Sequence, residues 1–139
     1  MIKAKDVVRM KIPYPSIHDG LALSSHMYIC NTANSTLREF VKCQTLKPYM
    51  LIQGTMRHYC DEQPNISRNP FKHTTRIDCD KLFTTSAVKY DLRLRTDSRT
   101  DICQSLYDDV VKELNEDGYT RINMNEAELK GLNPLITDI

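Results

Sequence analysis

Ser25–Pro48, with the sequence SHMYICNTANSTLREFVKCQTLKP, is the stretch that decides the predicted fold. It holds two runs rich in Val, Ile, Phe, Tyr or Cys, at 26–30 and 38–45, and neither run has a helical period. Such runs are typical of β-strands. The polar cluster at 31–36 is typical of a turn, and Pro48 stops the second run because proline lacks the backbone donor that a ladder needs. We therefore expect a hairpin or an adjacent pair of strands.

Polar residues stand at the ends of these two predicted strands. Ser25 and His26 open the first strand, while Thr45 and Lys47 follow the apolar part of the second. In an antiparallel pair the start of one strand lies beside the end of its neighbour. The inferred pairing therefore clusters these four residues, and a functional site can form there. The alternatives are plain structural roles: a strand-edge histidine bonded to a carbonyl, a β-branched strand residue and a solvated charge.

The composition predicts one globular domain that spans residues 1–139. Hydrophobic residues make up 40% of the chain and charged residues 27%, which is near the average for soluble proteins. No run of about 18 apolar residues occurs, and residues 1–6 lack the apolar stretch of a signal peptide. We therefore expect a cytoplasmic protein without a membrane segment. The formal net charge is only +1, so contacts with nucleic acid would have to come from local clusters of charge.

The five cysteines predict reduced, buried thiols. Their number is odd, no Cys-x-x-Cys pair occurs, and each lies in or beside an apolar segment. A zinc site is the alternative, built from His58, Cys60, His73 and Cys79. Because this spacing matches no structural zinc pattern, we expect no metal and no other cofactor.

Further strands and loops follow from the pattern along the chain. Alternating apolar residues predict strands at 7–12, 74–83 and 88–95, with a short apolar run at 49–52, closed by Gly54, and a weaker strand at 56–60. The segment 13–24, which carries His18, is interpreted as a loop, since it begins with two prolines. Residues 61–72 contain two prolines and are expected to be the least structured part of the chain.

The period changes late in the chain, where it predicts a long amphipathic helix. Ile102, Leu106, Val110 and Leu114 recur every four residues. Ser98, followed by Asp101, resembles a capping box at the start of this helix, and Gly118 marks its end. A short helix is expected at 125–130. Several short strands followed by a long helix predict an α+β domain or a small barrel with a helix packed on it.

One segment gathers basic residues, namely Arg68, Lys72, His73 and Arg76. A cluster of this kind suits contacts with the phosphates of a nucleic acid. Solvated surface charge is the alternative interpretation.

Both the order of these elements and particular residues resemble the MazF/PemK family of toxin endoribonucleases. The resemblance is carried by KDVVRMKIPYP at 5–15, SHMYIC at 25–30, FVKCQT at 40–45, RIDCDKL at 76–82 and the helix at 98–114. It implies a small SH3-like β-barrel with a long C-terminal helix packed on it. It also implies a homodimer that cuts single-stranded RNA without a metal and that a partner antitoxin neutralises.

The chemistry implied by the resemblance needs three groups. One takes the proton from the ribose 2′-hydroxyl, one donates to the leaving 5′-oxygen, and a cation balances the charge that develops on the phosphate. In the family a threonine at the end of the third strand and an arginine at the head of the second supply much of this. Thr45 matches the threonine, while Ser25 or His26 stands where the family has arginine.

The resemblance therefore assigns two sets of residues. His26 has a side chain whose unperturbed pKa, about 6.5, suits proton transfer, and Lys47 supplies positive charge. The catalytic set is Ser25, His26, Thr45 and Lys47, and the RNA-binding set is Tyr14, His18, Arg68, Lys72 and His73. Tyr14 enters the second set because aromatic rings stack on unpaired bases. The alternative function is a non-catalytic SH3-like barrel that binds protein or nucleic acid, which the missing arginine favours.

Overall fold

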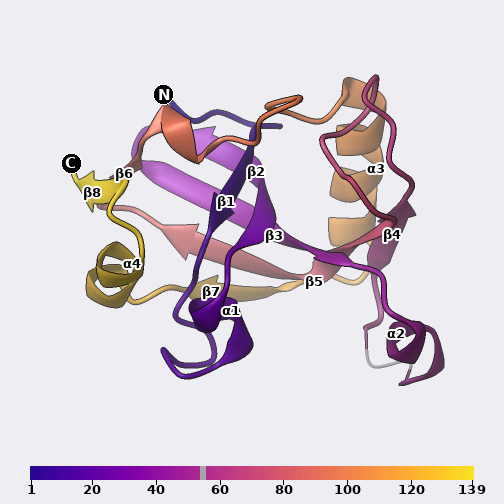
Figure 1. Cartoon of the computed structure of the whole chain (residues 1–139), viewed down its shortest axis with the longest axis horizontal. Coiled ribbons are helices and arrows are strands. Elements are labelled where there is room, and N and C mark those ends of the chain that lie inside the picture. The colour runs from indigo at the N-terminus through magenta and orange to yellow at the C-terminus, as the bar shows by residue number, and fades with distance from the viewer. Residues whose placement is uncertain (54–55) are drawn as a thin grey trace.

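The predicted hairpin lies at the centre of a β-sheet. In the computed structural model, which describes residues 1–53 and 56–139, β2 (His26–Asn34) and β3 (Leu37–Thr45) are antiparallel (Figure 1). Met27 stands opposite Cys43, and Ser35, in the turn, has a positive φ of 56°. The prediction of two paired strands at this place is confirmed.

Four more strands extend the hairpin into a mixed sheet. β1 (Val7–Met10) pairs with β2, and β5 (Thr75–Thr85) pairs with β3, both antiparallel. The outer edge of β5 is shared by antiparallel β4 (Tyr59–Glu62) and parallel β7 (Thr120–Asn123). A separate two-stranded sheet is formed by β6 (Val88–Tyr90) and β8 (Ile136–Asp138).

The helices are short and lie around this sheet. They are α1 (Gly20–Leu23), α2 (Pro48–Gln53), α3 (Gln104–Leu114) and α4 (Glu126–Leu132), together with the 3₁₀ turn η1 (Leu92–Leu94). The longest, α3, has 11 residues. In the part of the chain that the structure describes, no helix has the length and apolar character to cross a bilayer.

The α+β class is correct, but the closed barrel and the long C-terminal helix are wrong. The sheet is open, with the order β1-β2-β3-β5-β4, so its two edges do not pair with each other. The free edge of β1 is covered instead by the segment 95–101, through single bridges from Val8 to Arg95 and from Asp6 to Asp101. α3 is followed by β7, α4 and β8, so it does not close the chain.

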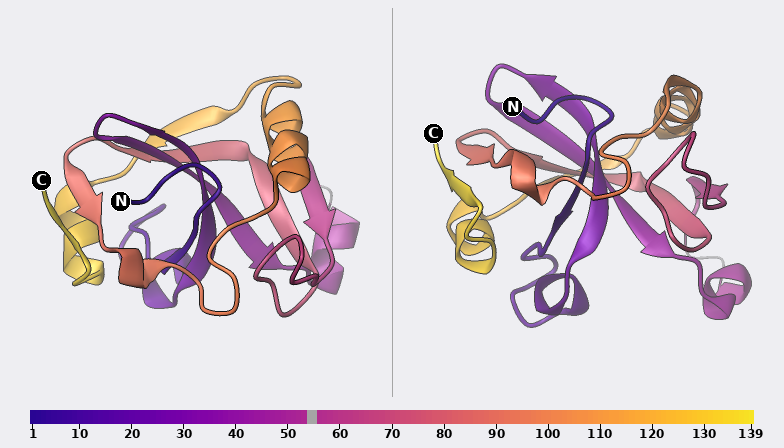
Figure 2. Two further views of the ribbon diagram at one scale, coloured as in Figure 1. Left: turned by 90° about the horizontal axis from the view of Figure 1, so that it is seen from above. Right: turned by 45° about the horizontal axis from the view of Figure 1, so that its top comes forward.

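Two apolar clusters pack on opposite faces of the sheet (Figure 2). On one face, Tyr28, Phe40 and Phe83 are fully buried and meet α4, β6 and β8. On the other face, Ile29, Val41 and Ile77 meet α3 through its buried side chains Leu106, Val110 and Leu114. Successive side chains of each strand therefore pack into different cores, which explains why several strands are nearly continuous apolar runs in the sequence.

Several element boundaries differ from the predictions. The helix at 98–114 begins later, because Cys103 is its N-cap and its Sγ accepts from the N–H of Leu106 at 3.4 Å. The run 49–52 belongs to α2, and the end predicted at Gly54 lies outside the described residues. The strand predicted at 88–95 stops at Tyr90 and continues as η1. The short helix predicted at 125–130 is confirmed as α4, whose N-cap is Asn125.

Candidate functional site

A polar cavity of about 240 Å³ opens at the end of the sheet where β2 begins and β3 ends. We call it the basin. Its lining residues are Arg9, Ser25, His26, Met27, Cys43, Thr45, Phe71, Lys72, His73 and Thr75. The strand register builds it, since Arg9 lies opposite Met27, and Met27 lies opposite Cys43. Two positions along the ladder, Thr45 lies opposite Thr75.

The basin brings together residues that the sequence analysis had assigned to two sets. Ser25, His26 and Thr45 come from the predicted catalytic set, while Lys72 and His73 come from the predicted RNA-binding set. The first three lie at the strand ends, as the hairpin predicted. The last two arrive from a loop more than twenty residues further along the chain.

The other four predicted site residues lie elsewhere. The ring of Tyr14 packs edge-on against Phe83 with 5.3 Å between centroids, so it belongs to the core. His18 is exposed in the loop before α1, and Lys47 is exposed at the corner between β3 and α2. Arg68 is paired with Glu62, with 2.7 Å between Nε and Oε2.

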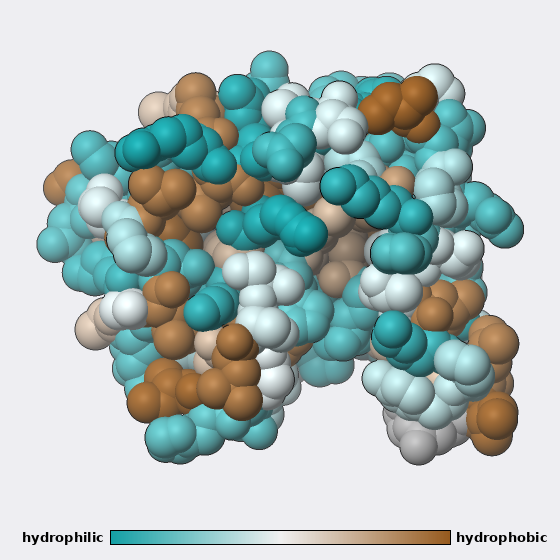
Figure 3. All heavy atoms as spheres, in the orientation of Figure 1, coloured by the Kyte–Doolittle hydropathy of each residue, from teal (hydrophilic) through white to brown (hydrophobic). Residues whose placement is uncertain are grey.

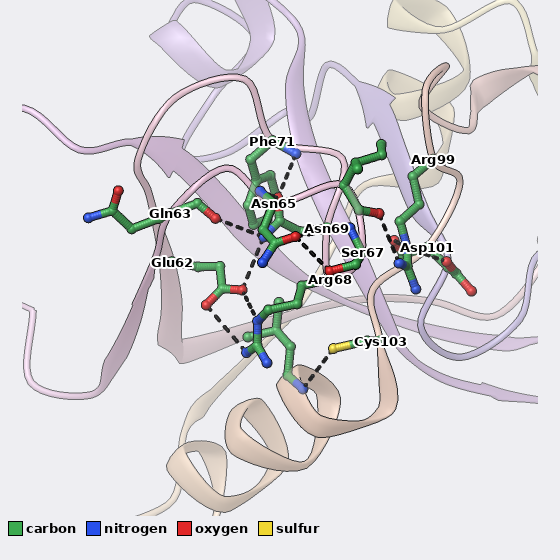
Figure 4. Close-up of polar contacts among 12 residues, drawn as sticks. Glu62, Gln63, Asn65, Ser67, Arg68, Asn69, Phe71, Arg99, Asp101 and Cys103 are labelled. Carbon is green, nitrogen blue, oxygen red and sulfur yellow. Dashed lines mark hydrogen bonds and ion pairs between the residues drawn. The ribbon is translucent and has the colours of Figure 1, made fainter.

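The segment 61–72, which the structure describes in full, has no helix or strand after Glu62, where β4 ends, as the sequence predicted, yet hydrogen bonds hold it in a defined shape. Asn69, only 1% exposed, is the centre of a hydrogen-bond network in it (Figure 4). Its side-chain amide donates to Glu62 Oε2 and to the carbonyl of Gln63, both at 3.0 Å, and its Oδ1 accepts from the N–H of Phe71 at 3.0 Å. The network fixes the loop just before Lys72 and His73 and thereby positions both residues at the basin.

A neighbouring segment holds this loop from outside. Arg99 donates to the carbonyl of Ile66 at 3.1 Å, and the N–H of Cys103 donates to the carbonyl of Arg68 at 2.8 Å. Figure 4 shows Arg99 beside the loop and Cys103 at the start of α3. The loop is thus attached to the body of the domain on both sides.

Arg9 is the basin residue that the sequence analysis missed. Val8 and Met10 lie on one face of β1 and Arg9 lies on the other. The sequence analysis interpreted the strand as half-exposed. The register of β1 against β2 was the signal needed, because it sets Arg9 beside Met27. An arginine is therefore present at the site, on β1 rather than at the head of β2.

The basin carries positive charge. Arg9 and Lys72 are cationic, two imidazoles lie with them, and among the described residues no carboxylate lines the cavity. Hydroxyls of Ser25 and Thr45 add neutral donors. Such a set suits an anion, above all a phosphate, which accepts hydrogen bonds from the arginine, the lysine and the two hydroxyls.

The environment of His26 fixes the state of its ring. Nδ1 lies 3.1 Å from the carbonyl oxygen of Ser24. Because a carbonyl only accepts, Nδ1 carries the proton, and Nε2 of the neutral ring keeps its lone pair. Burial lowers the pKa of His26, and the charges of Lys42 and Arg9 lower it further. The ring is therefore neutral at pH 7, the state that a general base requires.

The zinc alternative receives no support from the geometry. His73 lines the basin, whereas His58 lies between Glu113 and Asp117, with 3.3 and 3.0 Å from its ring nitrogens to their carboxylates. Within residues 1–53 and 56–139, no group of three or more His, Cys, Asp or Glu side chains is placed to hold a metal ion. All five cysteines are free, and Cys30, Cys43 and Cys79 are buried.

Comparison of the chain with models of protein families, with curated proteins and with solved structures finds no match in any of the three. The resemblance to the MazF/PemK family therefore stays a prediction from the sequence.

Proposed function

We propose that the protein is a metal-independent endoribonuclease and that the basin is where it cuts single-stranded RNA. The observation that supports this proposal is the set of groups around one cavity: two histidines, an arginine, a lysine and a threonine. Cleavage by the 2′-hydroxyl of RNA needs a base, an acid and positive charge on the phosphate, and this set contains all three.

Five of the basin residues have a role in the proposed reaction. His26 takes the proton from the 2′-hydroxyl, whose oxygen then attacks the adjacent phosphorus. The bond from phosphorus to the 5′-oxygen breaks, and His73 gives a proton to that oxygen. Arg9 and Lys72 balance the charge on the phosphate, and Thr45 donates a hydrogen bond to it. The products are a 2′,3′-cyclic phosphate and a free 5′-hydroxyl.

The family resemblance supports the same reaction from a separate direction. It places Thr45 at the position of the family's threonine. Arg9, from the neighbouring strand, supplies an arginine to the same cavity, where Ser25 or His26 stands at the family's arginine position. The homodimer and the antitoxin partner that the resemblance implies belong to this proposal and remain predictions. The cytoplasmic location, expected from the sequence pattern, remains a prediction as well.

The test is incubation of the purified protein with a long single-stranded RNA in EDTA, followed by mapping of the cut ends. Discrete cuts with 5′-hydroxyl and cyclic phosphate ends are the expected result. RNA with a 2′-deoxy nucleotide before a mapped cut should stay intact at that position, because it lacks the attacking oxygen. If the RNA stays intact in the presence of folded protein, the endoribonuclease proposal is rejected and the non-catalytic binding module is the function that is left.

A further inference from the structure

A second polar cavity, of about 280 Å³, lies on the opposite face of the sheet from the basin. We call it the cleft. Its lining residues are Lys42, Gln44, Tyr49, Met50, Met56, Arg76, Asp78, Asp80 and Lys81. Figure 3 shows a notch in the surface between the lobe that carries α1 and the lobe that carries α2; Ser25 and His26 of the basin come just after α1, and Tyr49 and Met50 of the cleft belong to α2. The strands β3 and β5 provide the floor of the cleft.

A buried carboxylate holds two lysines side by side in the cleft. Asp78 is 1% exposed, and Lys42 Nζ and Lys81 Nζ each lie 3.6 Å from its Oδ2. This oxygen has no hydrogen-bond partner among the described residues. One carboxylate between two ammonium groups leaves one net positive charge. The ammonium donors that do not face Asp78 are therefore available to an anion.

The other charged groups of the cleft are already occupied. Arg76 makes two hydrogen bonds to Asp61, at 2.7 and 2.8 Å, and lies 3.7 Å from the centre of the Tyr59 ring. Asp80 accepts from the backbone N–H groups of Arg57 and His58, at 2.8 and 3.0 Å. These hydrogen bonds leave the charge of Asp80 in place, so three cations and two carboxylates line the cleft and give it a net charge of +1. The donors still free for an anion are those of the two lysines.

One wall of the cleft suits a flat ring. Tyr49 is 54% exposed although its ring is large and mostly apolar. Met50 and Met56 line the cleft together with it. Base stacking on an aromatic side chain is a general means of binding unpaired nucleotides. The amide of Gln44 adds a donor and an acceptor for the edge of a base.

The cleft and the basin are adjacent along one ladder. Thr45 and Thr75 are paired and line the basin, while the next pair, Gln44 and Arg76, lines the cleft. Successive side chains of a strand point to opposite faces, so the two cavities lie back to back at the same end of the sheet. The exposed Lys47 stands at the corner between them.

We propose that the cleft binds a further nucleotide of the RNA strand that is cut in the basin, with its phosphate on Lys42 and Lys81 and its base against Tyr49. The strand leaves the basin, passes Lys47 at the corner and enters the cleft. This inference rests on the proposed function for the identity of the strand. It adds that the enzyme selects its substrate partly through a nucleotide away from the cut.

The test measures binding without cutting. The probe is a labelled 2′-O-methyl single-stranded RNA, which has no attacking hydroxyl, and the readout is fluorescence anisotropy. Tyr49→Ala should weaken binding of a longer strand by roughly fivefold or more, because one stacked base is lost. The same change should leave binding of a dinucleotide unaltered, since a dinucleotide fills only the basin. Tyr49→Phe keeps the ring and should bind as the wild type does.

A second variant tests the phosphate contact. Lys81→Gln should reduce the slope of log affinity against log salt by about 0.7, the value for one phosphate contact on a single strand. Lys89→Gln, an exposed lysine of β6 outside both cavities, is the matched control and should leave the slope unchanged. A merely structural role for Lys81 would change the affinity without changing this slope.

Every outcome decides the inference. If the wild type binds the longer strand and either the Tyr49→Ala or the Lys81→Gln variant binds it equally well, the cleft is rejected and the basin stands. Failure of the wild type to bind any strand rejects the cleft and the proposed function together. Loss of binding in both variants by a protein that never cuts unmodified RNA supports the cleft and rejects only the catalysis.

Discussion

His26 gives the reaction a predictable dependence on pH. Burial, with help from the charges of Lys42 and Arg9, lowers the pKa of this histidine below its usual 6.5. As a base it acts when neutral, so the cleavage rate should rise with pH along the acidic limb of the profile, with a midpoint below pH 6.5, while the general acid sets the other limb. Arg9→Gln removes one of the charges and should move this midpoint upward while slowing the reaction. The measurement is the single-turnover rate against pH for the two proteins.

If the Arg9→Gln variant and the wild type have the same midpoint, this would contradict the effect of the Arg9 charge on the pKa of His26. A midpoint at or above 6.5 in the wild type would contradict the assignment of His26 as the base.

At the level of single residues, the sequence predicted those site members that lie at strand ends. Ser25, His26 and Thr45 were placed correctly because the pairing of two strands fixes where their ends meet. Arg9 was missed, because the alternation of residues in a strand predicts on which face a side chain lies but not which other residues pack next to it. Lys47 was misplaced because the chain turns into α2 directly after it, which takes the lysine out to the corner.

The loop between β4 and β5 depends on Asn69. Its side chain makes hydrogen bonds to three backbone groups and to Glu62 while almost fully buried. Asn69→Ala should therefore lower the free energy of unfolding by about 2 to 4 kcal/mol, because buried donors and acceptors lose their partners. Urea denaturation measures this. Asn65→Ala removes exposed contacts to Ser67 and should cost less, so equal losses would contradict the central place of Asn69.

His58 joins β4 to α3 and should make the stability depend on pH. Its hydrogen bonds to Glu113 and Asp117 raise its pKa above the usual 6.5. A raised pKa in the folded state stabilises the protein below the unfolded value, and the effect is lost as the pH rises through the folded value. The Tm of the wild type should therefore exceed that of His58→Gln by more at roughly pH 5.5 than at roughly pH 8.5. An equal difference at both pH values would show that His58 acts without its charge.

At the level of elements, long apolar periods were predicted well and short runs were not. The four-residue repeat gave α3 because it continues over three turns, and Asn125 gave α4 through its cap. The run 49–52 was left without a helical assignment, since four apolar residues carry no period, and Leu51 and Ile52 are exposed in α2. The order of 61–72 depends on contacts with distant residues such as Arg99, which no local pattern shows.

The whole molecule explains why the barrel was a wrong prediction although several predicted site residues line one cavity. Strand order and local pairing are shared by an open sheet and a closed barrel, and closure depends on whether the two edge strands meet. Here the edge of β1 is covered by the chain before α3, and β7 shares the edge of β5 with β4. The basin needs only the β1-β2-β3-β5 part of the sheet, of which the sequence predicted the four strands and the pairing of β2 with β3.

Each face of the open sheet carries one polar cavity. The basin and the cleft occupy the same end of β3 and β5 on opposite sides, while the apolar clusters fill the remainder of each face. A strand of RNA can therefore follow the end of the sheet from one cavity to the other. This arrangement joins the proposed cleavage to the proposed selection of substrate.

The measurement that tests the central claim most directly is the rate at which single-stranded RNA is cut by the wild type and by basin variants of confirmed fold. His73→Gln and His26→Asn should each slow cleavage by about 100-fold or more, the usual cost of losing a general acid or base. Lys89→Gln, outside both cavities, should cut at the rate of the wild type. Cleavage by either histidine variant at the wild-type rate would contradict the basin as the site of the reaction.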